Sequence, residues 1–469
     1  MRCSGWWLVA LTGAGAPAQP AAPTWSTDVA PLVYRHCTEC HRPGQVAPFS
    51  LLEYAGAAKR AGDLSRATRA HYMPPWLPEG MPGVFLGERR LSADEIEILA
   101  RWAAAGAPAG DLERAPKPPP PPGDGWALGP PDLIVRMKQP FNIPAGPADT
   151  YVVFPVPLSL EGVPADVLAR ARIPDSDVLG VAAVEIRPGN THAFHHGDVW
   201  SDQTGLARRR EAQEGGNGFA SFGTPGFPPV ARLGGRVPGQ TARFLPPGIA
   251  ASVLPLTGDV VFQIHYRATG KPETDQSEIG IHFMREPVKR ILDSLLLRSF
   301  NLDIPAGAAN FTVEDSLDVP ADCVLMDLLP HMHLVAREVH ARVVFPDGTT
   351  RPLLDISRWD FKWQDRYALR EPYVLPRGAR LLCRWVFDNS AANRRNPFKP
   401  PRPIQFGPNA TDEMCALDLG VIPLHLEDVP LFAAAREQKL REKIAELTPE
   451  QRSRHNWSEA FEAVSPAPK

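Results

Sequence analysis

The chain has 469 residues, enough for about three domains of ordinary size. Proline accounts for 53 of them, roughly twice the usual share, and this density excludes a mostly helical protein because proline interrupts helices and central strands. A hydrophobic content of 43% excludes global disorder, and 50 basic against 53 acidic residues give no reason to expect nucleic acid or an anionic membrane as partner. No apolar run approaches the roughly 18 residues of a spanning helix, so no membrane span is expected.

Residues 1–23 have the pattern of a signal peptide. One arginine precedes an apolar run, Trp6 to Ala16, and Ala16-Pro17-Ala18 offers a cleavage site of small residues. We therefore expect a periplasmic or secreted protein, in which disulfides and covalently attached cofactors are permitted. Of six cysteines, Cys3 leaves with this leader, and the few others exclude a disulfide scaffold.

The remaining chain divides into segments of different character. Residues 24–112 have helical patterns, including a capping box at Ser92 and Glu95. A proline-rich linker, 113–129, contains the run Pro118 to Pro122 and should be a stiff extended spacer. Beyond it, alternating strands separated by Pro/Gly turns predict two β-sandwiches, and 431–469 return to a charged helical pattern.

The first chemical motif is CxxCH at Cys37, Cys40 and His41. Two thiols at this spacing can form thioether bonds to haem, and the adjacent histidine is placed to bind the iron. A redox CxxC would need a strand–helix context, and a zinc site would need a second cysteine pair nearby; neither is found in the sequence. The motif therefore predicts one covalently bound haem c.

A sixth iron ligand is expected from Met73, which lies in the sequence HYMPPW. The prolines that follow forbid a helix there, so the methionine should lie on a stiff extended loop that presents its sulfur. Met81 and His71 are the competing candidates, and filling of the core is the ordinary role of a methionine. With these features, this part of the chain resembles the small c-type cytochrome domains of bacterial proteins.

Five of the thirteen histidines have a spacing suited to metal binding in the strand-rich region. His331 and His333 are two residues apart, so on a strand they share one face. His195 and His196 are adjacent and would diverge on a regular strand, so joint ligation requires a strand end, a bulge or a tight twist. His265 follows in the predicted strand Val260 to Tyr266.

Met414 is a further candidate ligand in this region. A thioether together with two imidazoles selects Cu(I), and a site with three protein ligands keeps a position open for O2. Zinc would instead favour cysteine or a carboxylate beside histidine.

The ordered motifs HH, QIHY, HMH and TDEMC resemble the copper type II, ascorbate-dependent monooxygenases, the family of the peptidylglycine α-hydroxylating and dopamine β-monooxygenases. This resemblance implies two all-β jelly-roll sandwiches (130–286 and 287–430), and with the resemblance to c-type cytochromes it gives a multidomain fold that begins with a small all-α cytochrome c domain (24–112). It further implies two copper ions, held by the residue sets His195, His196, His265 and His331, His333, Met414.

The resemblance also implies a Cys383–Cys415 disulfide next to the ligand methionine, with Cys323 left as a buried thiol. Two positions depart from the peptide-amidating members of the family. Leu329 replaces an arginine that grips the substrate carboxylate, and Asp418 replaces a tyrosine. Both departures argue against a peptide C-terminus as substrate and leave the copper ligands unchanged.

The expected activity is therefore hydroxylation of a small-molecule C–H bond with O2, with one-electron donation from ascorbate, a redox protein or the fused haem domain. A haem–copper electron-transfer or copper-binding protein without oxygenase activity is the alternative. An interaction scaffold with incidental histidines is a third possibility. A zinc hydrolase is disfavoured because no suitably spaced carboxylate base accompanies His331 and His333.

Overall fold

The structure is a computed structural model that describes residues 21–43, 45, 47–120, 126–146, 149–221, 225, 231–236, 242–407 and 409–453. Most of the predicted signal peptide and part of the predicted proline linker lie outside these residues. The described chain forms two compact units. Of the described residues, the first unit comprises those within 21–43, 47–74 and 91–119, and the second comprises 45 and those within 75–90 and 120–453.

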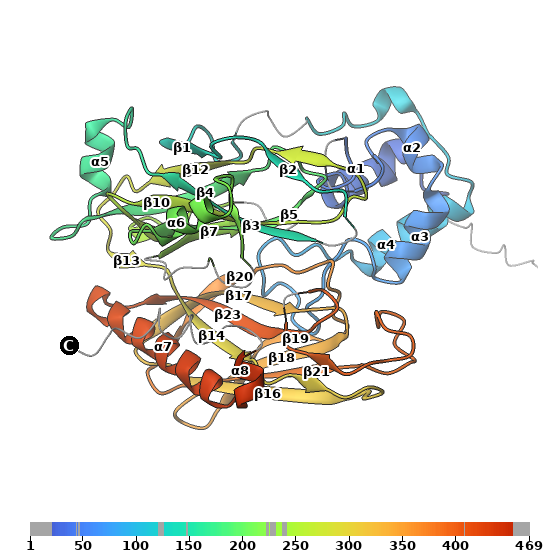
Figure 1. The fold of residues 1–469 in the computed structure, drawn as a ribbon. Helices are drawn as coiled ribbons and strands as arrows, with labels where there is room; N and C mark the ends of the chain where they lie inside the picture. Colours follow the sequence, from blue (N-terminus) through green and yellow to red (C-terminus); the bar gives the residue numbers. More distant parts are fainter. Residues whose placement is uncertain are drawn as a thin grey trace, which may run out of the picture. The chain divides into compact units, whose positions relative to one another are not determined.

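The named elements of the first unit are all helices (Figure 1). They are η1 (Trp25–Val29), α1 (Ala30–His36), α2 (Tyr54–Ala58), α3 (Ala61–Arg69), α4 (Ala93–Ala104) and η2 (Leu112–Arg114). The predicted capping box is confirmed at the start of α4, where the Ser92 side chain accepts from the Glu95 N–H and the Glu95 side chain accepts from the Ser92 N–H. The helices enclose a small core around Trp25 and Trp102, which are 2% and 0% exposed.

The second unit begins its strand-rich part with two sheets that share one core. A four-stranded sheet has the order β1 (Leu133–Arg136), β12 (Glu278–Phe283), β4 (Val178–Arg187) and β9 (Ser252–Pro255). A five-stranded sheet has the order β6 (Phe219–Ala220), β3 (Thr150–Pro157), β10 (Asp259–Tyr266), β5 (Phe194–Asp202) and β7 (Ala231–Arg236). Smaller elements around them are β2 (Phe141–Ile143), β11 (Glu273–Asp275), β8 (Ile249–Ala250), β13 (Arg290–Ile291), α5 (Ala165–Ala171) and α6 (Leu206–Gln213).

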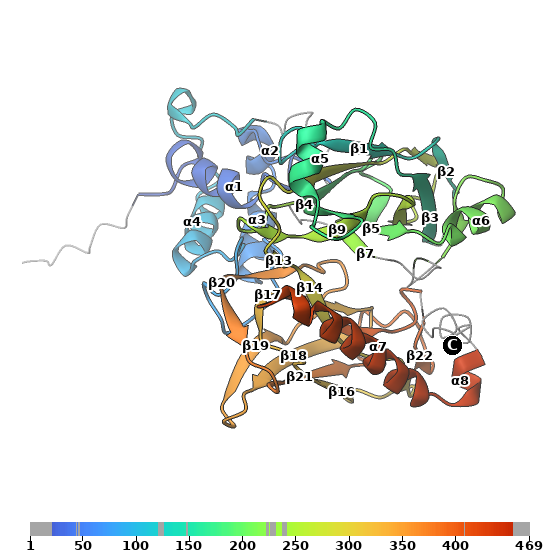
Figure 2. The same cartoon turned by 90° about the vertical axis from the view of Figure 1, so that its left-hand side faces the viewer.

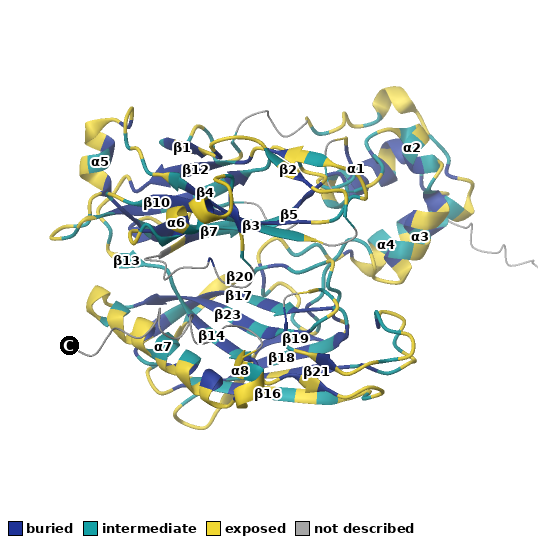
Figure 3. Ribbon diagram, in the orientation of Figure 1, coloured by how far each residue is buried: buried dark blue, intermediate teal, exposed yellow. Residues whose placement is uncertain are grey.

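A second pair of sheets follows and encloses a core of its own. One sheet has the order β14 (Asp293–Ser299), β23 (Cys415–Pro423), β17 (Cys323–Met332) and β20 (Tyr367–Leu375). The other has the order β16 (Phe311–Asp318), β21 (Arg380–Phe387), β18 (Ala336–Val344) and β19 (Thr350–Ile356), and β15 (Asp303–Ile304) pairs with β22 (Ile404–Gln405). Figure 3 shows buried residues concentrated along these strands. The predicted sandwich-like, strand-rich architecture is therefore confirmed.

Alternation along the strands explains why they bury one face. In β21, Leu381, Cys383, Trp385 and Phe387 are all buried, whereas Arg380 and Arg384 are exposed. A period of two is what a strand with one face on a core requires. Strands β17 and β18 are separated by a short turn.

The predicted Cys383–Cys415 disulfide is not formed in the structure, where both residues are free, buried thiols. Cys383 lies on β21 and Cys415 on β23, which belong to the two different sheets of this sandwich. The Cys415 Sγ instead lies 3.7 Å from the carbonyl oxygen of Ser299 as a weak donor. Cys323 is a buried free thiol, as predicted.

The charged helical pattern near the C-terminus forms α7 (Val429–Ala445), after the short η3 (Leu426–Asp428), and α8 (Pro449–Ser453). Helix α7 lies along β14, as Figure 2 shows. Two of its lysines reach a buried acid on β16: Lys439 Nζ lies 2.6 Å and Lys443 Nζ 3.0 Å from Asp315 Oδ1. Within the parts of the chain that the structure describes, no helix has both the length and the apolar character needed to cross a membrane.

Replacing Asp315 by alanine should loosen α7, because it removes the acid that pairs with the buried Lys439 and leaves Lys443 with only the half-exposed Glu446 as counter-charge. We expect the free energy of unfolding of this sandwich to fall by about 3 kcal/mol, measured by urea unfolding followed by circular dichroism. Arg441→Ala, which removes an exposed ion pair with Glu437 on the same helix, is the matched control and should cost well under ~1 kcal/mol. Equal unfolding midpoints for the two variants would contradict this role of Asp315.

Candidate metal centres

The first histidine cluster lies where β5 and β10 pair as antiparallel neighbours. His265 is directly opposite His196, but the next residue of β10, Tyr266, is opposite Phe194. The register therefore shifts by one residue, which leaves His195 as the extra residue of a β-bulge. This is the kind of irregularity that the adjacent histidines require in order to face one point together.

The three imidazoles of this cluster are in mutual reach. One possible ligand atom from each of His195, His196 and His265 lies within 4.8 Å of the others. The Nδ1 atoms of His195 and His265 are 3.2 Å apart, and all three rings have centroids 4.7 to 5.3 Å from one another. Nitrogen atoms about 2 Å from a shared metal ion would be this close together. The cluster therefore has the donors and the spacing of a metal site.

Two residues near the beginning of β3 contact His265 from the side away from the other two imidazoles. The Asp149 carboxylate lies 3.0 Å from Nε2 of His265, and the Tyr151 ring stacks on the imidazole with centroids 4.1 Å apart. Tyr151 is the cross-strand partner of His265 on β3. A carboxylate on the outer ring nitrogen fixes the tautomer, so that Nδ1 of His265 is left with a lone pair for a metal ion.

Burial keeps the imidazoles of His195 and His196 in the neutral form that binds a metal. Burial, followed by the neighbouring His265, lowers the pKa of His195 to about 4 and that of His196 well below its usual value. Burial by itself would raise the pKa of Asp149, but hydrogen bonds from His265 and from the Ala268 N–H lower it overall. Neutral imidazoles beside an ionised carboxylate are what ligation of a divalent or monovalent metal requires.

The second cluster lies at the end of β17. His331 and His333 have ring centroids 5.1 Å apart with planes at 88° to each other, so both imidazoles lie on one side of the strand, as their spacing predicts. Burial lowers the pKa of His331, and burial together with His331 lowers that of His333 to about 3. Both imidazoles are therefore neutral.

The neighbouring strand brings Met414 to the same end of the sheet. Met332 is paired with Cys415 on β23, so His333 and Met414 are the next residues beyond this pair. Their N–H groups donate to one oxygen, Oε2 of Glu413, over 2.9 and 3.1 Å. The structure therefore brings together the strand ends that carry all three predicted ligands of this centre.

Glu413 is a residue of this centre that sequence reasoning missed. Its side chain is fully buried and also accepts from the N–H groups of Val335 and Ala336, over 2.8 and 3.1 Å. Burial raises its pKa to about 8, against the opposing effect of these backbone N–H groups. An acidic residue directly before the predicted ligand Met414 was the available signal, but only the fold reveals its partners.

The outer nitrogens of His331 and His333 also have acceptors. His331 Nδ1 is 2.6 Å from Oε1 of Gln364, whose own Nε2 donates to the Phe361 carbonyl. His333 Nδ1 is 3.2 Å from the Asp412 carbonyl oxygen. Both contacts keep the proton on Nδ1 and leave Nε2 available as the ligand atom.

The two positions that depart from the family pattern lie side by side. Leu329 on β17 is the cross-strand partner of Asp418 on β23. The Asp418 carboxylate accepts from Arg366 over 3.0 Å, and this buried guanidinium also contacts Asp327 at 2.5 Å. An acid held by an arginine therefore occupies the place where the family pattern has a tyrosine.

The CxxCH motif of the first unit lies on a turn that follows α1. The N–H groups of Cys40 and His41 both donate to the Cys37 carbonyl, and the Cys37 and Cys40 side chains are half-buried. His41 Nδ1 lies 3.3 Å from the Phe49 carbonyl oxygen, which leaves its Nε2 available. Met73 lies shortly after α3, and its N–H donates to the Ala67 carbonyl.

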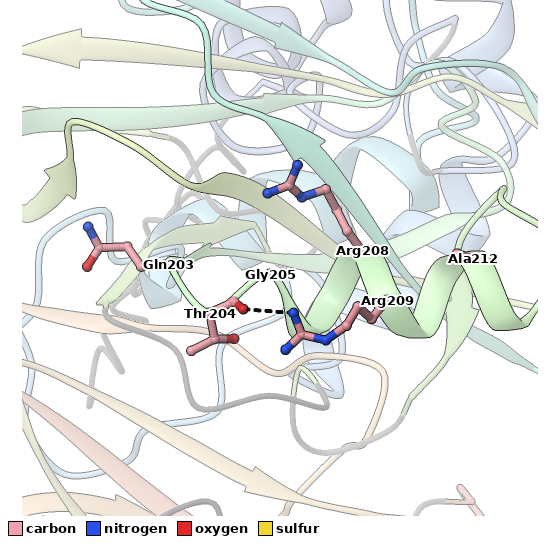
Figure 4. A pocket seen from close by; sticks show the side chains of 6 residues that line it. All are labelled: Gln203, Thr204, Gly205, Arg208, Arg209 and Ala212. Carbon is pink, nitrogen blue, oxygen red and sulfur yellow. Dashed lines mark hydrogen bonds between the residues drawn. The ribbon is translucent and has the colours of Figure 1, made fainter.

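A separate pocket lies at the start of α6 (Figure 4). It has a volume of about 430 Å³ and is lined by Gln203, Thr204, Gly205, Arg208, Arg209 and Ala212. Arg209 donates to the Thr204 carbonyl over 3.2 Å. None of the clustered histidines lines this pocket, so it is not part of either candidate metal centre.

Comparison with known proteins adds no assignment. No family model matches the sequence, and no curated protein matches it. A structure of the infectious bursal disease virus Gx strain aligns at 11% identity over 64% of this chain and 74% of that chain, with a TM-score of 0.19. A two-domain protein of unknown function from Bacteroides fragilis aligns at 8% identity over 58% and 95%, with a TM-score of 0.15. Likenesses this weak carry no argument.

Replacing Asp149 by asparagine should weaken metal binding at the first cluster by about 10- to 100-fold, because His265 loses the carboxylate that orients its ring. Competition titration with a chromophoric copper chelator would measure this change. Asp177→Asn is the matched control, since Asp177 is an exposed acid of the same sandwich that pairs only with Arg172 among the described ion pairs. Unchanged affinity in the Asp149 variant would exclude an orienting role for this carboxylate.

Proposed function

We propose that this chain is a copper-dependent monooxygenase that hydroxylates a substrate C–H bond with O2. The observation that carries the proposal is the presence of two histidine clusters of different composition. One consists of three imidazoles at the β5–β10 bulge, and the other consists of two imidazoles at the strand end beside Met414. Two centres with different donors suit two tasks, electron storage at the first and oxygen activation at the second.

The donor chemistry of the clusters fits copper. His195, His196 and His265 would hold one ion, and His331, His333 and Met414 would hold the other. Imidazole and thioether donors favour copper over zinc, and no cysteine belongs to the described cluster. When bound, copper supplies one-electron redox chemistry and, at a centre with three protein ligands, an open position for O2.

The surrounding residues would keep these donors in position. Asp149, Gln364 and the Asp412 carbonyl each accept from an outer ring nitrogen, so the protons of three imidazoles stay on the side away from the metal. Glu413 ties His333 and Met414 to one buried carboxyl group. Such preorganisation limits the rearrangement needed when an ion changes its oxidation state.

For the helical unit, the proposal is a c-type cytochrome domain. Cys37 and Cys40 would form thioether bonds to haem, His41 would bind the iron through Nε2, and Met73 is the preferred sixth ligand. The contact between His41 Nδ1 and the Phe49 carbonyl supports this assignment, because an outer acceptor is typical of metal-binding histidines. Haem supplies a one-electron carrier, and its covalent attachment goes together with the proposed export to the periplasm or cell exterior.

The overall reaction sets the demand for electrons. The substrate R–H, O2, two electrons and two protons give R–OH and water, so one oxygen atom enters the product and the other leaves as water. Ascorbate or the fused haem domain would supply the electrons one at a time. The two-sandwich region would adopt the jelly-roll fold of the family that the motifs resemble.

Metal analysis and oxygen consumption test the proposal. We expect two coppers and one iron per chain, and O2 uptake coupled to a hydroxylated product when a reductant and a panel of small substrates are supplied. His331→Ala should abolish O2 uptake, whereas His340→Ala should not, because His340 lies between Glu338 and Asp355 on the other sheet. Less than one copper per chain would refute the proposal. Full copper loading without O2 uptake would favour an electron-transfer protein.

Internal electron supply by the haem can be examined separately. We expect a reduced haem domain to be reoxidised by the oxidised copper centres of the same chain under anaerobic conditions, at a rate independent of protein concentration. Stopped-flow absorbance of the haem would record this step. The haem-free control is the Cys37→Ala/Cys40→Ala protein, whose copper centres should be reduced by added ascorbate alone. Haem that stays reduced would leave ascorbate or another external donor as the source.

A further inference from the structure

A segment close in sequence to the CxxCH unit is anchored on the C-terminal sandwich. This anchored segment, Pro75–Arg90, lies between two parts of the helical unit in the sequence but belongs to the strand-rich unit by its contacts. The helical pattern of residues 24–112 predicts instead that this segment is part of the helical domain. Both of its ends, at Pro74 and Leu91, continue directly into the helical unit.

The anchored segment extends the sheet that carries His331 and His333. The Leu86 N–H donates to the Ala368 carbonyl and the Arg370 N–H to the Val84 carbonyl, both over 2.8 Å. Between them, Phe85 forms an antiparallel bridge with Leu369 on β20. The segment therefore pairs as a short strand with the beginning of β20.

Aromatic packing secures this pairing. Phe85 is 1% exposed and belongs to the core of the sandwich, and its ring lies 5.6 Å from that of Tyr367. Trp76 lies edge-on to Tyr367 at 5.4 Å. Burial of an aromatic side chain contributes on the order of 2 kcal/mol, so the segment is held firmly at this end of β20.

Beside this packing, Arg89 forms an ion pair with Asp365. Arg89 also donates to the Pro75 carbonyl over 3.1 Å, so it joins the two ends of the anchored segment. Asp365 is 8% exposed, and a charge-assisted contact in such a place holds its loop more firmly than an exposed pair would.

Asp365 is the middle residue of three that face different parts of the protein. Gln364 contacts Nδ1 of His331, and Arg366 bridges Asp327 and Asp418 on the two strands that carry the second cluster. Neighbouring side chains of an extended segment point in opposite directions. The ion pair between Arg89 and Asp365 on one side of the segment therefore fixes the positions of Gln364 and Arg366 on the other side.

We propose that Arg89 is a positioning residue for the centre at His331 and His333, which it serves by holding Asp365 and so fixing Gln364 against the His331 imidazole. The inference rests on the proposed metal-binding role of these histidines.

Four single variants of the full chain, and one double variant, test this inference. Arg89→Met removes the ion pair, Arg89→Lys keeps the charge, and Gln364→Leu removes the contact with His331. Arg358→Met is the matched control, because Arg358 also joins the sandwich to the anchored segment, through an exposed contact with Glu79 at 3.4 Å. The probe is Cu(I), titrated against a chromophoric chelator so that the affinities of the two centres are resolved.

We expect Arg89→Met and Gln364→Leu each to weaken Cu(I) binding at the second centre by about tenfold and to leave the first centre unchanged. Arg89→Lys should recover much of the loss, and Arg358→Met should cause none. The double variant of Arg89 and Gln364 should be no weaker than Gln364→Leu, because both changes act through one contact. Additive losses, an unchanged second centre or equal weakening of both centres would overturn the inference.

A metal-free measurement separates this inference from the proposed function. In the apoprotein, Arg89→Met should raise backbone amide exchange at residues 361–366, and Arg358→Met should not. Exchange that stays the same overturns the positioning role even if copper binds. A wild-type chain that binds no copper at His331 and His333 overturns the proposed function, and the positioning role with it, whatever the exchange data show.

Discussion

Strand register is the constraint on which both histidine clusters depend. A slip of one residue would turn every side chain of a strand to the opposite face of its sheet. At the first cluster, the pairing of His265 with His196 is followed by a one-residue shift that adds His195 to the same site. At the second cluster, the pairing of Met332 with Cys415 brings His333 and Met414 to neighbouring strand ends. The backbone hydrogen bonds of the paired strands thus align both sets of donors.

The buried carboxyl group of Glu413 reinforces this alignment at the second cluster. It accepts from four backbone N–H groups, including those of His333 and Met414, in the turn between β17 and β18 and at the start of β23. A buried N–H without an acceptor costs about 1 to 3 kcal/mol, so alternative arrangements of these strand ends are disfavoured. His333 and Met414 are therefore both held by Glu413, and a displacement of either strand end would move both donors.

The two clusters differ in the groups that accept hydrogen bonds from the outer ring nitrogens of their histidines. The outer nitrogen of His265 meets a carboxylate, Asp149, whereas those of His331 and His333 meet a neutral amide and a backbone carbonyl. A charged acceptor makes an imidazole a stronger donor than a neutral one does. The first centre is therefore expected to favour the more highly charged state of a bound metal. The second, with its thioether neighbour, is expected to favour the lower state.

The sequence by itself determined the elements that depend on local patterns. These include the capped helix α4, the strand β10, and the shared face of His331 and His333. It also required an irregularity at His195 and His196, because adjacent side chains of a regular strand diverge. Only the tertiary structure decided the placement of Pro75–Arg90 on β20, the unbonded state of Cys383 and Cys415, and the partners Asp149, Gln364 and Glu413. These features join residues distant in the chain, and no local periodicity encodes such a contact.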